Sequence, residues 1–254
     1  MLASRASPAR PRFVAPALTR GSRRASRVSR LARASASYAT MGDFEKIAGD
    51  QPRGTLLMFS FGANIDPSRL RSRGVSPSAS LLARAPGYRL NFIHRGGYAT
   101  IDEVCDEVWD QPAADDESAP ADHPHSPVPH PPGGAWGAVH RISRSELALV
   151  RRWEVGYETR EIDAMVRADP ESPEVRVRAL VFVTRRSARL RRSVPPFREY
   201  AEKICAGAEV MRAPPAYRDM LAAHLARSVP YAERGEEYFD LAPWSPFPSP
   251  FGRR

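Results

Sequence analysis

Glu154 is the residue of this sequence best placed for acid–base chemistry. Ser143 and Glu146 have the spacing of a capping box, which predicts the start of a helix. Leu147, Val150 and Glu154 then follow at intervals of three and four, so a carboxyl group continues an apolar stripe that faces the interior. Because glutamate is rarely buried unless it is paired or functional, burial there would raise its pKa toward neutrality and suit it to proton transfer.

The same periodicity leaves a second orientation open. If the end of the helix frays, Glu154 turns outward and meets Arg151 or Arg160 in a surface salt bridge of little energetic consequence. Spacing alone does not decide between the two orientations.

A loop of small residues is the second candidate for chemistry. Residues 55–61 are β-branched and aromatic enough to predict a buried strand, and Asp66-Pro67 supplies an N-cap followed by a proline at the first helical position. The chain must turn between them, where Gly62 and Asn64 tolerate positive φ and the bare Gly62 lets backbone N–H groups approach an anion. We therefore predict a ligand cradle; the alternative is an ordinary strand-to-helix turn.

The amino-terminal segment differs from the rest in composition. Residues 1–41 contain nine arginines, no lysine and no acidic residue, and are rich in serine and alanine. This composition predicts a disordered organelle transit peptide. Serine and alanine favour the chloroplast, the arginine density leaves the mitochondrion open, and a start at Met41 would leave the protein in the cytoplasm. The alternative is a basic arm that binds an acidic partner.

The charge of the remaining chain argues against nucleic acid as a partner. The whole sequence has 38 basic and 29 acidic residues, so removal of the nine leader arginines leaves equal numbers of each. A nucleic-acid-binding domain needs its basic excess on the folded part. The arginine cluster at residues 185–192 is interpreted as a solvated turn. No apolar run approaches the ~20 residues needed to cross a bilayer, so we expect a soluble protein without a membrane partner.

Domain limits follow from composition. Residues 110–134 are dominated by Pro, Asp, Ala and His and predict a disordered insertion. His123, His125 and His130 lack a spacing that would fix a metal, so no metal is expected, and Cys105 and Cys205 form no disulfide framework. The predicted domain covers residues 42–232, followed by a C-terminal tail at 233–254. Expected strands lie at residues 88–93, 98–101, 135–142, 159–166 and 175–183, and expected helices begin near residues 67, 143, 195 and 214.

Four segments in order resemble the gamma-glutamylcyclotransferase family over roughly residues 55–232. The segment Met58-Phe59-Ser60-Phe61-Gly62-Ala63-Asn64 is similar to the family's Tyr-Gly-Ser-Asn binding loop, and Gly96-Gly97-Tyr98-Ala99-Thr100-Ile101 is similar to its Gly-Gly-x-Ala-Thr-Ile strand. Glu154 falls where the family has its catalytic glutamate. The helix that begins Pro195-Pro196-Phe197-Arg198-Glu199-Tyr200 resembles the family's Pro-Pro-x-x-x-Tyr helix.

The resemblance implies an α+β fold, a small mixed β-barrel with surrounding helices, and a reaction that needs no cofactor. In that reaction the α-amine of a γ-glutamyl compound attacks its own γ-carbonyl and gives 5-oxoproline and a free amine or amino acid. Glu154 would be the general acid/base, residues 58–64 and Tyr200 would bind substrate, and Tyr157 could orient the Glu154 carboxyl. The sequence departs from the pattern at Phe61 and Ala63, which remove two loop hydroxyls.

Two further hypotheses stay open. The chain could be a non-catalytic member that binds a γ-glutamyl ligand, because the loop hydroxyls are lost. It could also act on another acyl-amine substrate, such as a γ-glutamyl-lysine remnant. The partner expected under each hypothesis is a small molecule, and the sequence gives no indication of oligomeric state.

Overall fold

The structure is a computed structural model that describes residues 41–104, 128, 130–168 and 172–242. The predicted transit peptide, Cys105 and most of the 110–134 insertion lie outside the described residues, as does the chain after residue 242.

Five strands close into a mixed barrel in the order β1-β5-β2-β6-β7. β1 runs antiparallel to β5 and parallel to β7, and the other neighbours are antiparallel. The strands are β1 (Thr55–Ser60), β2 (Ala79–Ala85), β5 (Ala135–Ser143), β6 (Tyr157–Val166) and β7 (Val175–Thr184). The α+β architecture with a small mixed barrel is therefore confirmed. Strand β2 has no counterpart among the strands expected from the sequence.

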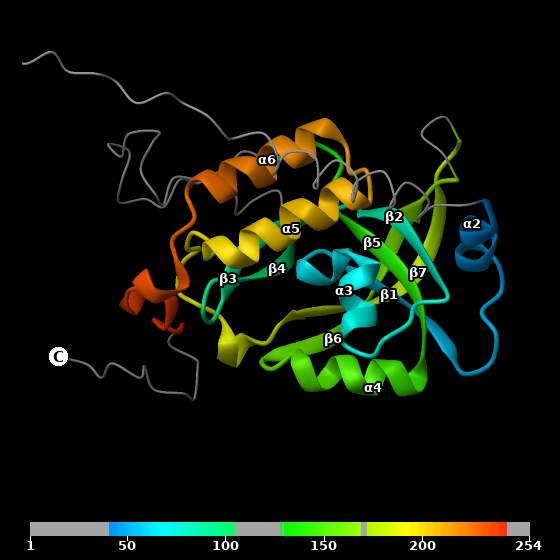
Figure 1. Ribbon diagram of the computed structural model, residues 1–254, viewed down its shortest axis with the longest axis horizontal. Coiled ribbons are helices and arrows are strands. Elements are labelled where there is room, and N and C mark those ends of the chain that lie inside the picture. The colour runs from blue at the N-terminus through cyan, green and yellow to red at the C-terminus, as the bar shows by residue number, and fades with distance from the viewer. Residues whose placement is uncertain (1–40, 105–127, 129, 169–171, 243–254) are drawn as a thin grey trace, which may run out of the picture. The chain divides into compact units, whose positions relative to one another are not determined.

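A hairpin and five helices complete the described fold. The hairpin pairs β3 (Tyr88–His94) with β4 (Tyr98–Glu103). The helices are α2 (Met41–Ala48), α3 (Pro67–Ser72), α4 (Arg144–Trp153), α5 (Arg198–Val210) and α6 (Pro215–Ala226). In Figure 1, α5 and α6 lie side by side along one side of the barrel strands and α4 lies along the other. Short 3₁₀ turns lie at η1 (Ala63–Ile65), η2 (Arg186–Ala188), η3 (Tyr231–Glu233) and η4 (Glu236–Tyr238).

Helix α4 starts where the capping box predicts. The Ser143 hydroxyl accepts a hydrogen bond from the Glu146 backbone N–H, and the Glu146 carboxylate accepts one from the Ser143 N–H. Leu147 and Val150 are buried in an apolar cluster with Met58 of β1. The cap fixes where α4 begins and the cluster holds its inner face against the barrel, so that the last turn of α4 borders the cavity.

The packed chain extends beyond the domain boundary expected at residue 232. Tyr238 is buried, donates a hydrogen bond to the Pro195 carbonyl, and shares an apolar cluster with Leu190 and Leu241. Residues 233–242 therefore pack on the domain, because the aromatic side chain of Tyr238 and the aliphatic side chain of Leu241 hold them there. At the other margin, Val128 is buried and residues 130–134 lead directly into β5, so the end of the expected disordered insertion is part of the fold.

Within the described ranges, no helix has both the length and the apolar character to cross a membrane. The same residues contain no group of three or more His, Cys, Asp or Glu side chains that could hold a metal ion.

Candidate active site

The predicted loop lies between β1 and α3 and lines a cavity of about 400 Å³. Asp66 caps α3, accepting hydrogen bonds from the Ser68 backbone N–H at 2.7 Å and the Ser68 hydroxyl at 2.6 Å. Pro67 occupies the first helical position. The local sequence therefore ends the strand and starts the helix as predicted, and the intervening turn faces the cavity.

The loop does not use the positive φ that glycine and asparagine tolerate. Gly62 has φ −98°, and Arg212 is the one non-glycine residue with positive φ in the described chain, so neither Gly62 nor Asn64 uses the left-handed region. Gly62 is needed for another reason: a Cβ atom there would lie 2.7 Å from the Tyr200 hydroxyl oxygen. The missing side chain makes room for Tyr200 of α5, and residues 63–65 fold into a 3₁₀ turn.

Glu154 is the first residue after α4, and its carboxyl faces the loop. The Asn64 side-chain amide donates a hydrogen bond to Glu154 Oε1 at 2.8 Å, across ninety positions of sequence. Arg160 instead pairs with Glu158 at 2.9 Å, and Arg151 is exposed. Of the two orientations left open by periodicity, the structure has the one that points into the cavity.

Burial and two polar neighbours act in opposite directions on the pKa of the Glu154 carboxyl. Burial raises the pKa of the Glu154 carboxyl above its ordinary value, while the charge of Arg73 and the Asn64 hydrogen bond oppose this rise. The net rise brings the pKa of this carboxyl closer to the range that suits a general acid and base.

Asn64 is held from behind by a buried histidine. His140 is fully buried on β5, with Nε2 3.0 Å from the Asn64 backbone carbonyl oxygen and Nδ1 2.9 Å from the Ser80 hydroxyl. Because a carbonyl oxygen only accepts, Nε2 carries the proton and the Ser80 hydroxyl donates to Nδ1. Burial lowers the pKa of His140 to about 4, so the ring is neutral and keeps this arrangement at neutral pH.

Two tyrosines contact β4 at the cavity wall. The Tyr200 hydroxyl accepts a hydrogen bond from the Ala99 backbone N–H at 3.3 Å, and the Tyr157 hydroxyl donates to the Ala99 carbonyl at 2.7 Å. Burial raises the pKa of Tyr157 well above its ordinary value, so this phenol stays protonated. The hypothesis that Tyr157 orients Glu154 is not supported, because its hydroxyl is bonded to the strand.

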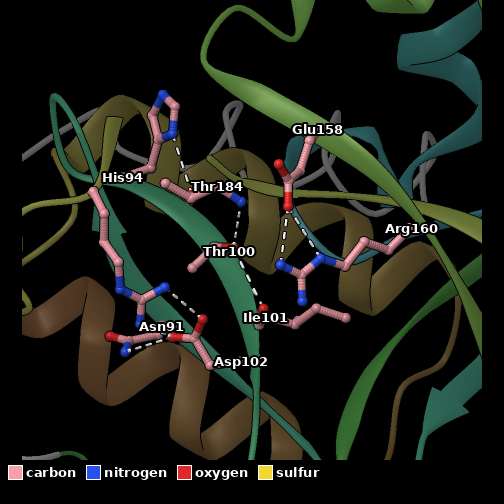
Figure 2. Close-up of polar contacts among 9 residues, drawn as sticks. Asn91, His94, Thr100, Ile101, Asp102, Glu158, Arg160 and Thr184 are labelled. Atoms are coloured by element: carbon pink, nitrogen blue, oxygen red, sulfur yellow. Dashed lines mark hydrogen bonds and ion pairs between the residues drawn. The ribbon is translucent and has the colours of Figure 1, made fainter. Parts of the chain in front are cut away.

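His94 is a further cavity residue. Its ring stacks on Tyr157 at a centroid distance of 4.1 Å, and Nδ1 lies 3.2 Å from the Thr184 hydroxyl. Figure 2 shows that the hydrogen bonds continue beyond Thr184, whose backbone N–H donates to the Thr100 hydroxyl. Burial lowers the pKa of His94 to about 4, so it presents a neutral ring to the cavity.

The structure brings all the sequence-predicted site residues together. The cavity is lined by Glu154, Tyr200 and the loop residues Met58, Phe59, Ser60, Phe61, Gly62, Ala63 and Asn64. Sequence reasoning did not find Arg73, Trp153, His94 and Lys203, which line the same cavity. A cue existed only for Trp153, which immediately precedes Glu154. The role of each residue in binding or catalysis stays a prediction.

No known family model and no curated protein matches the sequence. Among solved structures, the chain is similar to one described as a gamma-glutamyl cyclotransferase, at 20% identity over 66% of this chain and 87% of that chain, with a TM-score of 0.47. An uncharacterized protein from Homo sapiens has 19% identity over 75% and 95% of the two chains and a TM-score of 0.48. A yeast gamma-glutamyl cyclotransferase specific to glutathione has 15% identity over 68% and 98%, with a TM-score of 0.40.

Identities of 20% and below assign no activity to the chain.

Proposed function

We propose that this protein is a gamma-glutamylcyclotransferase that converts a γ-glutamyl compound to 5-oxoproline and a free amine or amino acid. The observation that carries the proposal is the 2.8 Å contact between Asn64 and Glu154, which places a half-buried carboxyl opposite the Gly62–Asn64 loop. The cavity of about 400 Å³ falls within the range of about 300–1,000 Å³ for small-molecule sites.

The proposed reaction uses one carboxyl group and no covalent intermediate. Glu154 accepts a proton from the substrate α-ammonium, and the freed amine attacks the γ-carbonyl carbon. The new ring C–N bond forms as the bond to the leaving nitrogen breaks, and Glu154 returns its proton to that nitrogen. The ionised carboxylate then takes the second proton from the ring nitrogen and passes it to the leaving amine. Overall, two protons leave the α-nitrogen and two reach the leaving nitrogen, so a neutral lactam and an ammonium group result.

The remaining cavity groups would hold the substrate in a folded shape that favours ring closure. Backbone N–H groups of the loop would bind the α-carboxylate or the developing oxyanion. Tyr200, which accepts from Ala99, keeps its own hydroxyl hydrogen and would donate it to substrate.

One observation favours a second candidate, a protein that binds a γ-glutamyl ligand without turnover. Phe61 and Ala63 stand where the family pattern has hydroxyl side chains, and both are buried, so they offer the cavity no polar group. Backbone contacts do not depend on these two side chains.

One experiment separates the two candidates. The full chain is incubated with a panel of γ-glutamyl amino acids, γ-glutamyl-lysine and glutathione, 5-oxoproline is measured by mass spectrometry, and binding is measured by calorimetry. We expect 5-oxoproline from at least one compound. Binding without product would favour the second candidate, and neither binding nor product would refute both.

A further inference from the structure

Arg73 is a charged side chain that contacts the Asn64–Glu154 pair directly. Its Nη1 donates a hydrogen bond to Asn64 Oδ1 at 3.2 Å, and its guanidinium lies 4.0 Å from the centroid of the Trp153 ring. Trp153 is the last residue of α4 and directly precedes Glu154. The same helix end therefore supplies both the ring that holds Arg73 and the carboxyl that faces it.

The backbone fixes Arg73 at this point. It caps the C-terminus of α3, with its N–H bonded to the Leu70 carbonyl. The next residue is Gly74, whose φ of +83° ends the helix in a conformation that suits glycine. Arg73 is therefore anchored at its backbone by the helix end and at its guanidinium by Trp153.

This contact determines which way the Asn64 amide points. A guanidinium has only donors, so the Asn64 atom that faces Arg73 must be the carbonyl Oδ1. The amide Nδ2 must then face Glu154, where a donor stabilises an ionised carboxylate. A flipped amide would present Oδ1 to Glu154 and would favour the protonated carboxyl instead.

We propose that Arg73 is a positioning residue, which sets the orientation of the Asn64 amide and places a positive charge beside Glu154, so that the carboxyl can serve as a base. The inference rests on the proposed function only in assigning Glu154 that role. It is supported by the charge of Arg73, which lowers the pKa of Glu154 against the effect of burial.

Other ionisable groups share the cavity with Glu154. They are Arg69, Lys203, His94, Tyr98, Tyr157 and Tyr200. The pKa of Glu154 responds to burial, Arg73 and Asn64, so the titration of this carboxyl reports on Arg73 and on the amide it orients.

The test compares Arg73→Met, Arg73→Gln and Arg73→Lys with Arg71→Met, which removes an exposed arginine of the same helix. Two measurements are made on the full chain: the pH dependence of kcat and kcat/KM, and the titration of the Glu154 carboxyl by ¹³C NMR, assigned with Glu154→Gln. Thermal unfolding checks that each variant folds. Lysine keeps the charge without the planar stack, and glutamine keeps a donor without the charge.

We expect Arg73→Met to lower kcat/KM at neutral pH by about 10- to 150-fold, mainly in kcat, which corresponds to removal of one hydrogen bond to a charged group. Its Glu154 titration and the acidic limb of its pH profile should both move upward. In Arg73→Lys the midpoint of the Glu154 titration should stay close to that of the wild type, and in Arg73→Gln it should lie between those of the wild type and Arg73→Met. Arg71→Met should match the wild type.

An unchanged Glu154 titration in a folded Arg73→Met variant would overturn the proposal, whatever the activity. If the wild type lacks cyclotransferase activity, the proposed function fails, while the NMR titration still decides whether Arg73 controls the carboxyl.

Discussion

The close approach of Gly62 and Tyr200 yields a double-mutant test of how the loop and α5 share the site. A Cβ atom at Gly62 would lie 2.7 Å from the Tyr200 hydroxyl oxygen, whereas ordinary contacts begin near 3.4 Å. Tyr200 is buried, so the clash must be relieved by movement of the loop or of α5. Overpacking of this kind costs about 1–3 kcal/mol, and we expect Gly62→Ala to lose that much stability.

Removal of the hydroxyl group should relieve the clash. In Tyr200→Phe the nearest remaining atoms to the new methyl group are the ring carbon that bore the hydroxyl, at 3.8 Å, and Ala99 Cβ, at 4.0 Å. Tyr200→Phe alone should cost about 1 kcal/mol, because the Ala99 N–H loses its partner. The double variant should therefore be more stable than the two single losses would predict, by about 1–2 kcal/mol.

The assay is urea unfolding of the wild type, the two single variants and the double variant, with 5-oxoproline release measured in parallel. Tyr98→Phe provides the control, because its ring lies 5.1 Å from that of Tyr200 but leaves the Tyr200 hydroxyl in place. Additive losses in the Gly62→Ala/Tyr200→Phe cycle would refute the packing argument, as would equal rescue by Tyr98→Phe.

Three further predictions concern the groups that support the site. Burial lowers the pKa of His140 to about 4 in the folded state against an ordinary 6.5, so the native state binds fewer protons than the unfolded state. About 3 kcal/mol of stability, present above pH 6.5, should therefore be lost as the pH falls to 4. Urea unfolding over this pH range should show a smaller loss for His140→Gln than for the wild type. Asn64→Ala should shift the acidic limb of the pH–rate profile to higher pH, because it removes the hydrogen-bond donor to Glu154. Asn91→Ala removes a similar contact, between the Asn91 amide and the Asp102 carboxylate (Figure 2), and should leave the limb unchanged. Ser143→Ala should destabilise the protein by about 1 kcal/mol in thermal unfolding through loss of the α4 cap, and an unchanged Tm would contradict this.

Features that depend on local sequence could be predicted. The α4 cap follows from Ser143 and Glu146, whose contacts lie within one helical turn. The inward position of Glu154 was one of two orientations consistent with the apolar spacing, because a side chain at a helix end can turn either way. Its partner Asn64 is ninety residues away. The residues alone predicted the loop that contains Asn64, and only the family resemblance linked that loop to Glu154.

Features that depend on tertiary contacts could not be predicted from the sequence. Arg73 and His140 act on Asn64 from α3 and from β5, and no short-range pattern links them to it. The contact that requires glycine at position 62 was not predicted for the same reason, since the atom that excludes a side chain there belongs to Tyr200, 138 positions later in the chain. The packing of residues 233–242 depends on Tyr238, whose partners lie on other elements.

The most direct test of the account is the release of 5-oxoproline by Glu154→Gln compared with the wild type, with the best substrate from the panel. Glu158→Gln is the matched control, because Glu158 lies four residues away and pairs with Arg160 outside the cavity. The account predicts that Glu154→Gln loses about 10²- to 10⁴-fold in kcat, as expected for loss of a general acid/base, while Glu158→Gln keeps full turnover. Full turnover by a folded Glu154→Gln variant would contradict the assignment of this carboxyl as the proton carrier.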